Sequence, residues 1–465
     1  MNGEPTVVIA GGGLAGLTAA CDLADHGCRV VLLEKRPFLG GRAYSHRDEA
    51  TGTVVDNGQH VFLGCCTQYI AFLKRLGIYG RVHLQRRLRV PVIDKVWGES
   101  NLSSANLPAP LHMLPSLLRF RSLSPLEKVR AVHAFSRIRS LERAHHPELD
   151  SITFGDWLRR NGQSEHSTES LWNLIVQPTL NGNASSVSAD LALMVFQEGF
   201  LKARDGANVG WAKMGLTELL ADSARRYIEE RGGEVRAWTG IDTLELNAGV
   251  VSRVFAGGAQ MEADAYVLAM PTEETLGILP RPLADTPFFA RIGRIRTSPI
   301  VNVHLWYDRP VWEHRFAAFL NTPLQWAFNK SKLWGEDGSG QYIDISLSAA
   351  CDFLDMSGRE IAALFQKEMA ALIPAARGAR LERTIVIKQR DATFAAAPGI
   401  AALRPPQSTP VSNLFLAGDW TATGWPATME SAVRSGLGAA KAVLDNLRRL
   451  RTTGVEPAGK GAPHV

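Results

Sequence analysis

Several features that identify particular protein classes are missing from this sequence of 465 residues. It has no run of about 18 uninterrupted apolar residues, which a membrane-spanning helix needs. The apolar N-terminus is interrupted by Gly11, Gly12 and Gly13 and lacks the charged start of a signal peptide. The five cysteines are odd in number and never spaced C-x-x-C, so neither a disulfide framework nor a zinc site is indicated. We therefore expect a cytoplasmic protein, soluble or attached to the inner face of the membrane.

Charge is not concentrated in any basic run, although the net charge is +5 and the pI is about 9.0. Together with the lack of a zinc signature, this argues against nucleic-acid binding. A solvated basic surface explains the excess of lysine and arginine, and attraction to anionic lipid is the alternative. The length and the 45% hydrophobic content allow a large core and two structural lobes.

The strongest motif is a glycine turn between a predicted strand and a predicted helix. TVVIA, residues 6–10, predicts a buried strand, GGGLAG follows, and LTAACDLADHG has helical spacing. In a dinucleotide-binding fold, Gly11 makes the turn, Gly13 admits the pyrophosphate and Gly16 packs helix against strand. The second predicted strand, CRVVLLEK, brings Glu34 to the position that binds a ribose hydroxyl, and an acidic residue there disfavours NADP.

A second glycine turn, RPFLGGRAYS, distinguishes FAD from NAD. Gly40, Gly41 and Arg42 follow the second strand, where they can hold the far side of a long dinucleotide. GGGLAG, E-K-x-x-x-x-GGR and the C-terminal GD with MESAV resemble the flavin amine oxidase and phytoene desaturase superfamily over nearly the whole chain.

This resemblance implies a two-lobed α/β fold in which a Rossmann-like FAD-binding domain is interleaved with a substrate-binding domain. The FAD-binding domain is expected at residues 1–85, 206–275 and 385–450. The substrate-binding domain is expected at 86–205 and 276–384. The polar tail, residues 452–465, is expected to be disordered.

The C-terminal motif is expected to face the flavin. NLFLAGDW predicts a strand that runs into a Gly-Asp turn, and a helix is predicted to begin near Ala427 or Thr428. The resemblance implies that Asp419 binds the ribityl or phosphate part of FAD and that the helix N-terminus faces the flavin pyrimidine, where its N–H groups stabilise negative charge. Trp420 and Trp425 serve either this site or ordinary core packing.

Most of the predicted cofactor residues lie in these motifs. Two come from the resemblance alone: Gly58, and Val235 on a strand expected beside the adenine. The full set predicted to bind FAD is Gly11, Gly13, Leu14, Ala15, Gly16, Glu34, Lys35, Gly41, Arg42, Gly58, Val235, Gly418, Asp419, Thr428 and Met429.

Two residues typical of amine oxidases are absent. Aligned by eye, those enzymes have a tyrosine where this chain has Thr428 and a lysine where it has Asn302. Because a cage of aromatic side chains commonly holds an amine, an amine substrate is not expected.

Three stretches resemble the squalene-associated subgroup of phytoene desaturases, which includes hydroxysqualene dehydroxylases of hopanoid synthesis: VVDNGQHVFLG, VNVHLWYDRPVW and GDWTATGWPATMESAVRSG. The resemblance implies that reduced FAD gives hydride to a C30 allylic alcohol, hydroxysqualene, which loses water and becomes squalene. A carotenoid desaturase, in which oxidised FAD removes hydride, is the alternative enzyme. A prenyl-lipid binding protein of the Rab GDP-dissociation inhibitor type is the non-catalytic alternative, and the retained Gly41, Arg42 and Asp419 argue against it.

Dehydroxylation requires an acid near the flavin. His60 is the candidate, because the resemblance places a strand from Asp56 to His60 beside the flavin. On such a strand Asp56 shares a face with His60 and favours its charged form. Gln59 is a second candidate, for orienting the hydroxyl, and a structural hydrogen bond is the alternative role of His60. The electron donor and the oligomeric state stay open.

Residues 107–123, LPAPLHMLPSLLRFRSL, are the candidate membrane contact because leucines, Met113 and Phe120 far outnumber the charges. An apolar lid on the substrate domain is the alternative. In the helix predicted next, an apolar stripe of core type is expected from Val129, Val132, Phe135, Ile138 and Leu141.

Overall fold

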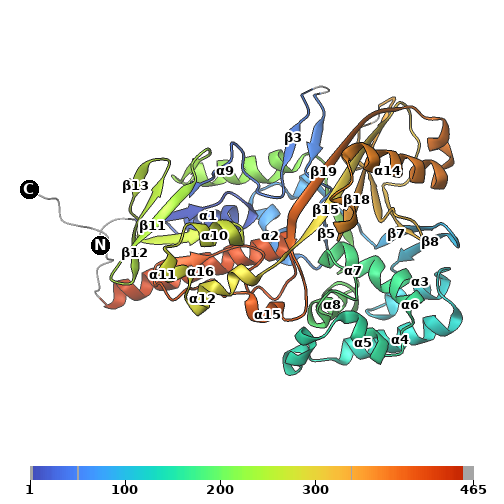
Figure 1. Cartoon of the computed structure of the whole chain (residues 1–465), viewed down its shortest axis with the longest axis horizontal. Helices are drawn as coiled ribbons and strands as arrows, with labels where there is room; N and C mark the ends of the chain where they lie inside the picture. The colour runs from blue at the N-terminus through green and yellow to red at the C-terminus, as the bar shows by residue number, and fades with distance from the viewer. Residues whose placement is uncertain (1–3, 50–51, 337, 454–465) are drawn as a thin grey trace, which may run out of the picture.

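The computed structural model describes residues 4–49, 52–336 and 338–453. The chain forms two parts and passes between them several times (Figure 1). A five-stranded parallel sheet lies at the centre of the left part, and a seven-stranded sheet with a group of helices below it makes up the right part. Within these described ranges no helix is both long and apolar enough to cross a bilayer.

The parallel sheet has the strand order β10-β2-β1-β14-β20. Its strands are β1 (Thr6–Ala10), β2 (Arg29–Leu33), β10 (Glu234–Arg236), β14 (Ala265–Leu268) and β20 (Leu414–Leu416). The strands are apolar almost throughout because both faces of the sheet are covered. One face packs on α1 (Leu14–Asp25), α9 (Asp222–Glu229) and α16 (Met429–Thr453).

The second face is covered by a small antiparallel sheet of β11 (Ile241–Asn247), β12 (Val250–Ala256) and β13 (Ala259–Met261). Val251 and Val254 of this sheet belong to the same core cluster as Val8 of β1. Both faces of the parallel sheet are therefore dry, and polar chemistry is confined to its carboxyl edge.

The seven-stranded sheet has the order β19-β15-β18-β17-β16-β7-β8. Its strands are β7 (Arg89–Asp94), β8 (Gly98–Ser103), β15 (Thr297–Tyr307), β16 (Phe316–Leu320), β17 (Trp326–Asn329), β18 (Gln341–Ser348) and β19 (Leu381–Phe394). On strand β15, next to the edge strand β19, Val301, Val303 and Leu305 pack toward α14 (Gly358–Leu372). Because side chains alternate along a strand, Asn302 and His304 lie on the opposite face.

The helices of the right part enclose a core of large aromatic side chains. They are α3 (Leu114–Arg119), α4 (Pro125–Ser140), α5 (Phe154–Arg160), α6 (Glu165–Ser167), α7 (Asn173–Leu180) and α8 (Ala189–Phe196). Phe154, Trp172 and Phe196 are fully buried, and their ring centroids lie 5.1 to 5.8 Å apart.

Short elements complete the fold. The helices are α2 (Thr67–Arg75), α10 (Thr272–Gly277), α11 (Arg281–Ala284), α12 (Pro287–Ala290), α13 (Lys330–Trp334) and α15 (Ile400–Leu403). The strands are β3 (Ser45–Arg47) and β4 (Val54–Asp56), which pair together, and β5 (Val61–Leu63), β6 (Val82–Leu84) and β9 (Val209–Ala212), which form a three-stranded sheet.

All five strands of the parallel sheet lie within the segments expected to bind FAD, and six strands of the larger sheet lie within the expected substrate segments. The exception is β19, which runs across the expected boundary between residues 384 and 385. The domain limits themselves stay a prediction. The expected tail begins too early, because α16 continues to Thr453, and residues 454–465 lie outside the described part of the chain.

The apolar stripe expected on α4 is wrong in part: Ile138 is buried and Phe135 and Leu141 pack against the core, but the two valines do not. Val129 is 67% exposed and Val132 is also exposed, whereas Ala131, Ala134 and Ile138 are fully buried. The small alanines let the helix pack closely, so the buried face is turned away from the larger valines. Within the segment expected to contact the membrane, Leu117 is 7% exposed and belongs to the core, but Leu118 is 57% exposed.

Candidate active site

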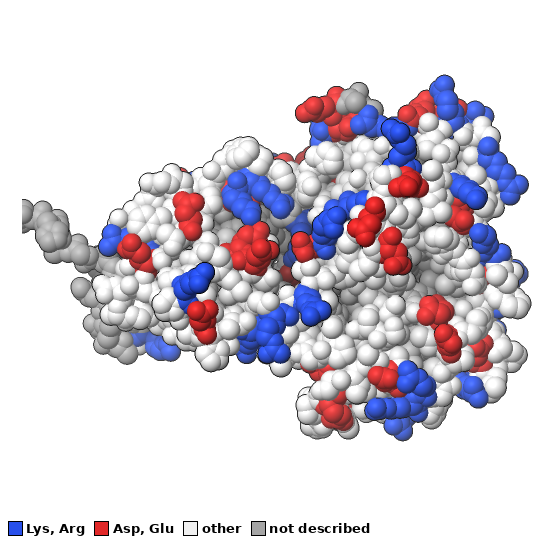
Figure 2. Space-filling model, viewed as in Figure 1, with Lys and Arg blue, Asp and Glu red and all other residues white. Residues whose placement is uncertain are grey.

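A cavity of about 700 Å³ lies at the carboxyl edge of the parallel sheet and extends under the seven-stranded sheet. In the space-filling view the surface is hollowed where the two parts meet, and side chains of both charge signs border the hollow (Figure 2). Ligands of open α/β sheets bind at this edge because the strand ends and helix N-termini converge there.

The two glycine turns are stacked on each other at the polar end of the cavity. The Gly40 N–H donates to the Gly12 carbonyl at 2.8 Å. A Cβ on Gly41 would lie 3.0 Å from Cα of Gly13, and Gly41 has a φ of +62°. Both Gly13 and Gly41 line the cavity, so the missing side chains leave room for a ligand. Gly16 is one turn behind, where a Cβ would lie 2.0 Å from the Gly11 carbonyl oxygen, and it serves helix packing.

Glu34 is buried beside the first turn and lines the cavity. Its carboxylate accepts hydrogen bonds from the Gly12 N–H at 2.8 Å and from the Arg36 N–H at 2.9 Å. A carboxylate has about four acceptor sites, so it can also accept bonds from a ribose. The neighbouring Lys35 lines the cavity and pairs with Glu274 at 2.8 Å.

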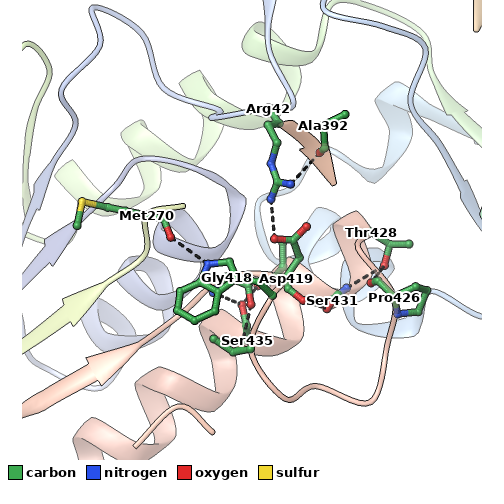
Figure 3. Close-up of polar contacts among 12 residues, drawn as sticks. Arg42, Met270, Ala392, Gly418, Asp419, Pro426, Thr428, Ser431 and Ser435 are labelled. Atoms are coloured by element: carbon green, nitrogen blue, oxygen red, sulfur yellow. Dashed lines mark hydrogen bonds and ion pairs between the residues drawn. The ribbon is translucent and has the colours of Figure 1, made fainter. Parts of the chain in front are cut away.

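Arg42 and Asp419 meet across the cavity, although they are 377 residues apart (Figure 3). The guanidinium donates to Asp419 at 2.5 Å and to the Ala392 carbonyl at 2.8 Å. Gly418 precedes Asp419 with a φ of +145°, and its N–H donates to Ser435 at 2.9 Å. This turn therefore fixes one buried carboxylate beside one partly exposed cation at the cavity wall.

The N-terminus of α16 points at the same wall. Thr428 caps the helix by accepting a hydrogen bond from the Ser431 N–H at 3.1 Å, as Figure 3 shows. The N–H groups of Met429 and Glu430 have no acceptor among the described residues, and both residues line the cavity. These free donors and the helix dipole fit an anionic or carbonyl-bearing ligand.

The segment with Gly58, Gln59 and His60 closes the cavity on another side. The expected strand from Asp56 to His60 is wrong: β4 ends at Asp56 and β5 begins at Val61. The loop is bent because Gly58 packs directly on Asn302, whose side-chain oxygen would lie 2.4 Å from a Cβ on that glycine. Asp56, at the end of β4, pairs with Lys330.

His60 is predominantly neutral at pH 7. Burial lowers its pKa below the usual value, although the Gly58 carbonyl and Asp56 act in the opposite direction. Its Nδ1 lies 2.9 Å from the Gly58 carbonyl oxygen, which can only accept. Nδ1 is therefore protonated, and Nε2 is the free acceptor of the neutral ring. Asp56 favours the charged imidazolium as expected, but burial outweighs it, so the expectation that the ring is charged is corrected.

The remainder of the cavity is walled mainly by apolar side chains from the seven-stranded sheet, from α7 and α8, and from β9 and the segments next to these elements. They include Leu88, Val90, Leu102, Leu174, Ile175, Pro178, Met194, Val195, Phe200, Val209, Ile278, Ile300, Trp326 and Phe328. Polar side chains also line it, on the sheet face that carries Asn302: Ser346, Ser348, Gln389 and Thr393.

The comparisons with known proteins agree with this geometry. The sequence matches the family of flavin containing amine oxidoreductases over residues 14–444. The chain belongs to this family. It is an FAD-dependent oxidoreductase, and the glycine cradle and the free helix N–H groups fit that cofactor.

Similar sequences include desaturases of carotenoid synthesis. A 15-cis-phytoene desaturase of Synechococcus elongatus is 27% identical, over 95% of this chain and 97% of that protein. A probable zeta-carotene desaturase of the same organism is 29% identical, over 94% of this chain and 98% of that protein. The 15-cis-phytoene desaturase of Solanum lycopersicum is 27% identical, over 96% and 78% respectively.

Solved structures confirm the predicted fold. Cyclohexylamine oxidase from Brevibacterium oxydans has a TM-score of 0.70 at 21% identity, covering 96% of this chain and 100% of that one. An oxidoreductase from Methanosarcina mazei has a TM-score of 0.74 at 18% identity, covering 94% and 99%. At such identities the likeness concerns architecture alone.

The structure brings nearly all the predicted site residues to one cavity. Gly11, Gly13, Leu14, Ala15, Glu34, Lys35, Gly41, Arg42, Gly58, Gln59, His60, Gly418, Asp419, Thr428 and Met429 line it. Gly16 and Val235 do not: Val235 is buried in the sheet opposite Leu32, and Gly240 and Ile241 line the wall in its place. Trp425 lines the cavity, and Trp420 donates to the Met270 carbonyl at 3.0 Å.

Sequence reasoning missed the apolar wall and Met270 with Pro271. The latter follow β14, so their place at the carboxyl end of a parallel strand was a usable signal. The wall residues on α7 and α8 carry no such signal, because they have the same composition as the core beside them.

Proposed function

We propose that this enzyme exchanges hydride with a long isoprenoid chain. The observation that carries the proposal is the single cavity in which a cofactor cradle continues into a mainly apolar chamber. Such a chamber stabilises a hydrocarbon by about 25 cal/mol for each Å² of apolar surface removed from water. Bound FAD supplies a two-electron carrier for hydride.

Desaturation is the direction that the relatives support. Their names describe desaturases of phytoene and zeta-carotene. Removing hydride from a hydrocarbon leaves a cation, which becomes an alkene when a base takes a neighbouring proton. A neutral His60 with a free Nε2 on the cavity wall suits that role.

Reductive dehydroxylation of a C30 allylic alcohol, hydroxysqualene, to squalene is our second candidate. It is favoured by the polar side chains on the sheet wall, among them Asn302, Ser346 and Gln389. Asn302 and Gln389 donate to Asp344 and Asn57, but a hydrocarbon offers no partner to the Ser346 hydroxyl, whereas one hydroxyl on an apolar chain can bind it. The stretches that resemble the squalene-associated subgroup support the same substrate.

One experiment separates the two directions. Purified protein with FAD is incubated without oxygen with hydroxysqualene and dithionite, and separately with phytoene or squalene and a quinone acceptor. Squalene formed from the alcohol supports dehydroxylation, and new conjugated double bonds support desaturation. Conversion of none of these substrates contradicts the proposal.

We also propose that the enzyme rests on an anionic bilayer on the cytoplasmic side. Six of the ten exposed large hydrophobic residues in the described ranges lie between residues 107 and 132: Leu107, Leu111, Leu118, Leu126, Val129 and Val132. Val96 and Trp97 are exposed at the turn between β7 and β8, next to Arg121, whose guanidinium lies near Gly98.

Charge supports a lipid partner for this surface. Residues 86–139 contain ten lysines and arginines and three acidic residues, whereas the whole chain has a net charge of only +5. Asp94 and Glu127, two of the acids, are buried. Apolar side chains surrounded by cations fit the interface of an anionic membrane. The strands β7 and β8 next to this surface also reach the cavity: Val90 on β7, Leu102 on β8 and Leu88 just before β7 line it.

Flotation with phosphatidylglycerol vesicles tests the surface. Replacing the exposed Leu118 and Val129 by Ser is expected to reduce the bound fraction and to raise the apparent KM for a vesicle-borne substrate. Trp238→Ser removes an equally exposed apolar side chain outside this surface and is the matched control. Equal binding of all three proteins contradicts the membrane contact.

A further inference from the structure

Lys330 is a buried cation that the site described so far does not use. It begins α13 and is fully buried. Its ammonium donates to Asp56 at 2.5 Å and to the side-chain oxygen of Gln59 at 2.9 Å. The face of the Trp334 ring lies 4.1 Å from the same nitrogen. A lysine is rarely buried without such complete pairing.

These contacts determine which way the Gln59 amide points. Only its oxygen can accept from an ammonium, so the amide nitrogen is directed away and donates to the His60 carbonyl at 3.0 Å. The ring of His60 is in turn held by the Gly58 carbonyl. One cation therefore fixes the Gln59 amide across 271 residues of sequence, while Asn57, earlier in the segment, is held by the Tyr44 carbonyl and by Gln389.

Lys330 lies outside the cavity and contacts residues of the cavity wall. Gly58, Gln59, His60 and Asn302 line the cavity, whereas Lys330 and Asp56 are not among its lining residues. Asn302 donates to Asp344 at 3.3 Å, and the side chains of Asp344 and His304 are also fully buried. The cation thus lies within a polar layer that supports the cavity wall from the side away from the ligand.

We propose that Lys330 is a positioning residue: its ammonium sets the orientation of Gln59 and thereby holds Nε2 of His60 toward the cavity. Asp56 is its counter-ion and anchors the segment at the end of β4, where it also accepts from the Leu216 N–H at 3.2 Å. The inference deepens the proposed function, since it concerns the residue that handles the proton in that reaction.

The test uses the holoenzyme and removes the ion pair as a unit. Lys330→Met combined with Asp56→Asn removes both charges of the ion pair together, and the buried Asp344 can become neutral by taking up a proton, so the protein is expected to fold. Gln59→Leu removes the acceptor and keeps the ion pair. Lys332→Met is the matched control, because Lys332 lies on the same helix as Lys330 and pairs at the surface with Glu313.

Two measurements are made on each variant. The first is the visible spectrum of bound FAD, and the second is the separate change in kcat and in KM relative to the wild type. Both test variants are expected to shift the flavin bands, because the polar wall around the ring changes. We expect kcat to fall by about 10- to 100-fold, the range that misplacing a catalytic group produces, while KM changes less than about twofold. Lys332→Met is expected to match the wild type.

A wild-type spectrum and wild-type kcat in Gln59→Leu overturn the inference, even if the double variant fails to fold. If the wild type converts no isoprenoid, the proposed function fails, but the spectra still decide the positioning role. Unshifted bands in Gln59→Leu then count against Lys330, and shifted bands with an unchanged Lys332→Met support it.

Discussion

Replacing Glu34 by Ala should weaken FAD binding and also lower the unfolding free energy of the apoprotein. The carboxylate is expected to accept a charge-assisted hydrogen bond from the adenosine ribose, and such a bond contributes about 1.5 to 3 kcal/mol. At about 1.4 kcal/mol for each tenfold change, the Kd for FAD should rise about 10- to 150-fold. In the protein itself, the Gly12 and Arg36 N–H groups lose their shared acceptor.

The second loss is separable from the first. A buried N–H left without a partner costs about 1 to 3 kcal/mol, so the apoprotein should lose about 2 kcal/mol or more of unfolding free energy. Flavin fluorescence in dilute protein measures the Kd, and thermal unfolding without FAD measures the apoprotein. Glu234→Ala is the control, because Glu234 is a half-exposed glutamate on the neighbouring strand β10.

Equal FAD affinity in Glu34→Ala and the wild type would refute the ribose role of the carboxylate. If affinity falls while the apoprotein melts at the wild-type temperature, the turn does not depend on Glu34. That result would refute the argument from the two backbone hydrogen bonds and leave the ribose contact intact.

Three further outcomes are expected. Gly418→Ala should cost about 2 kcal/mol, because the residue has a φ of +145° and the new Cβ would lie 2.5 Å from the Trp420 ring nitrogen; an unchanged unfolding temperature would contradict this. His60→Ala should slow desaturation by about 10²- to 10⁴-fold, and wild-type activity should fall on the acid side of pH 6.5 as the ring gains its proton; a pH-independent wild type would exclude the base. Burial raises the pKa of Asp344 from 3.8 to about 7. Between these pH values the folded state binds one proton more than the unfolded state, so the free energy of unfolding falls as pH rises through this range. Asp344→Asn should remove that fall in unfolding midpoints measured from pH 4 to 8.

The cofactor cradle was predictable because its signals are local. Gly11, Gly13 and Glu34 stand at fixed spacing around one strand and one helix, and the structure has both elements where the sequence predicts them. The loop before His60 was not predictable. The resemblance implies a strand from Asp56 to His60, but Gly58 must fit against Asn302, and Lys330 must reach Asp56 from 274 residues away.

Helix α4 illustrates a different limit. Periodicity shows that a helix has an apolar stripe, but the partner decides which stripe is buried. Here Ala131 and Ala134 allow close approach, so the larger Val129 is left on the surface. A core judged from side-chain size alone therefore finds Ile138 and Phe135 but wrongly adds the two valines, and the exposed face is identified only when the packing is known.

The alternation of side chains along β15 explains how one sheet has an apolar face and a polar face. Val301, Val303 and Leu305 seal one face against α14, and Asn302 and His304 therefore must occupy the other. His304 is fully buried, and burial lowers its pKa to about 3, so it adds no charge to this face. Lys330 and Asp56 are paired with each other. Asp344 is paired opposite His304 on the next strand, and burial raises the pKa of Asp344 to about 7. This face of the sheet therefore offers hydrogen bonds with little net charge, so that part of the wall stays compatible with a hydrocarbon and His60 is left as the base proposed for proton transfer.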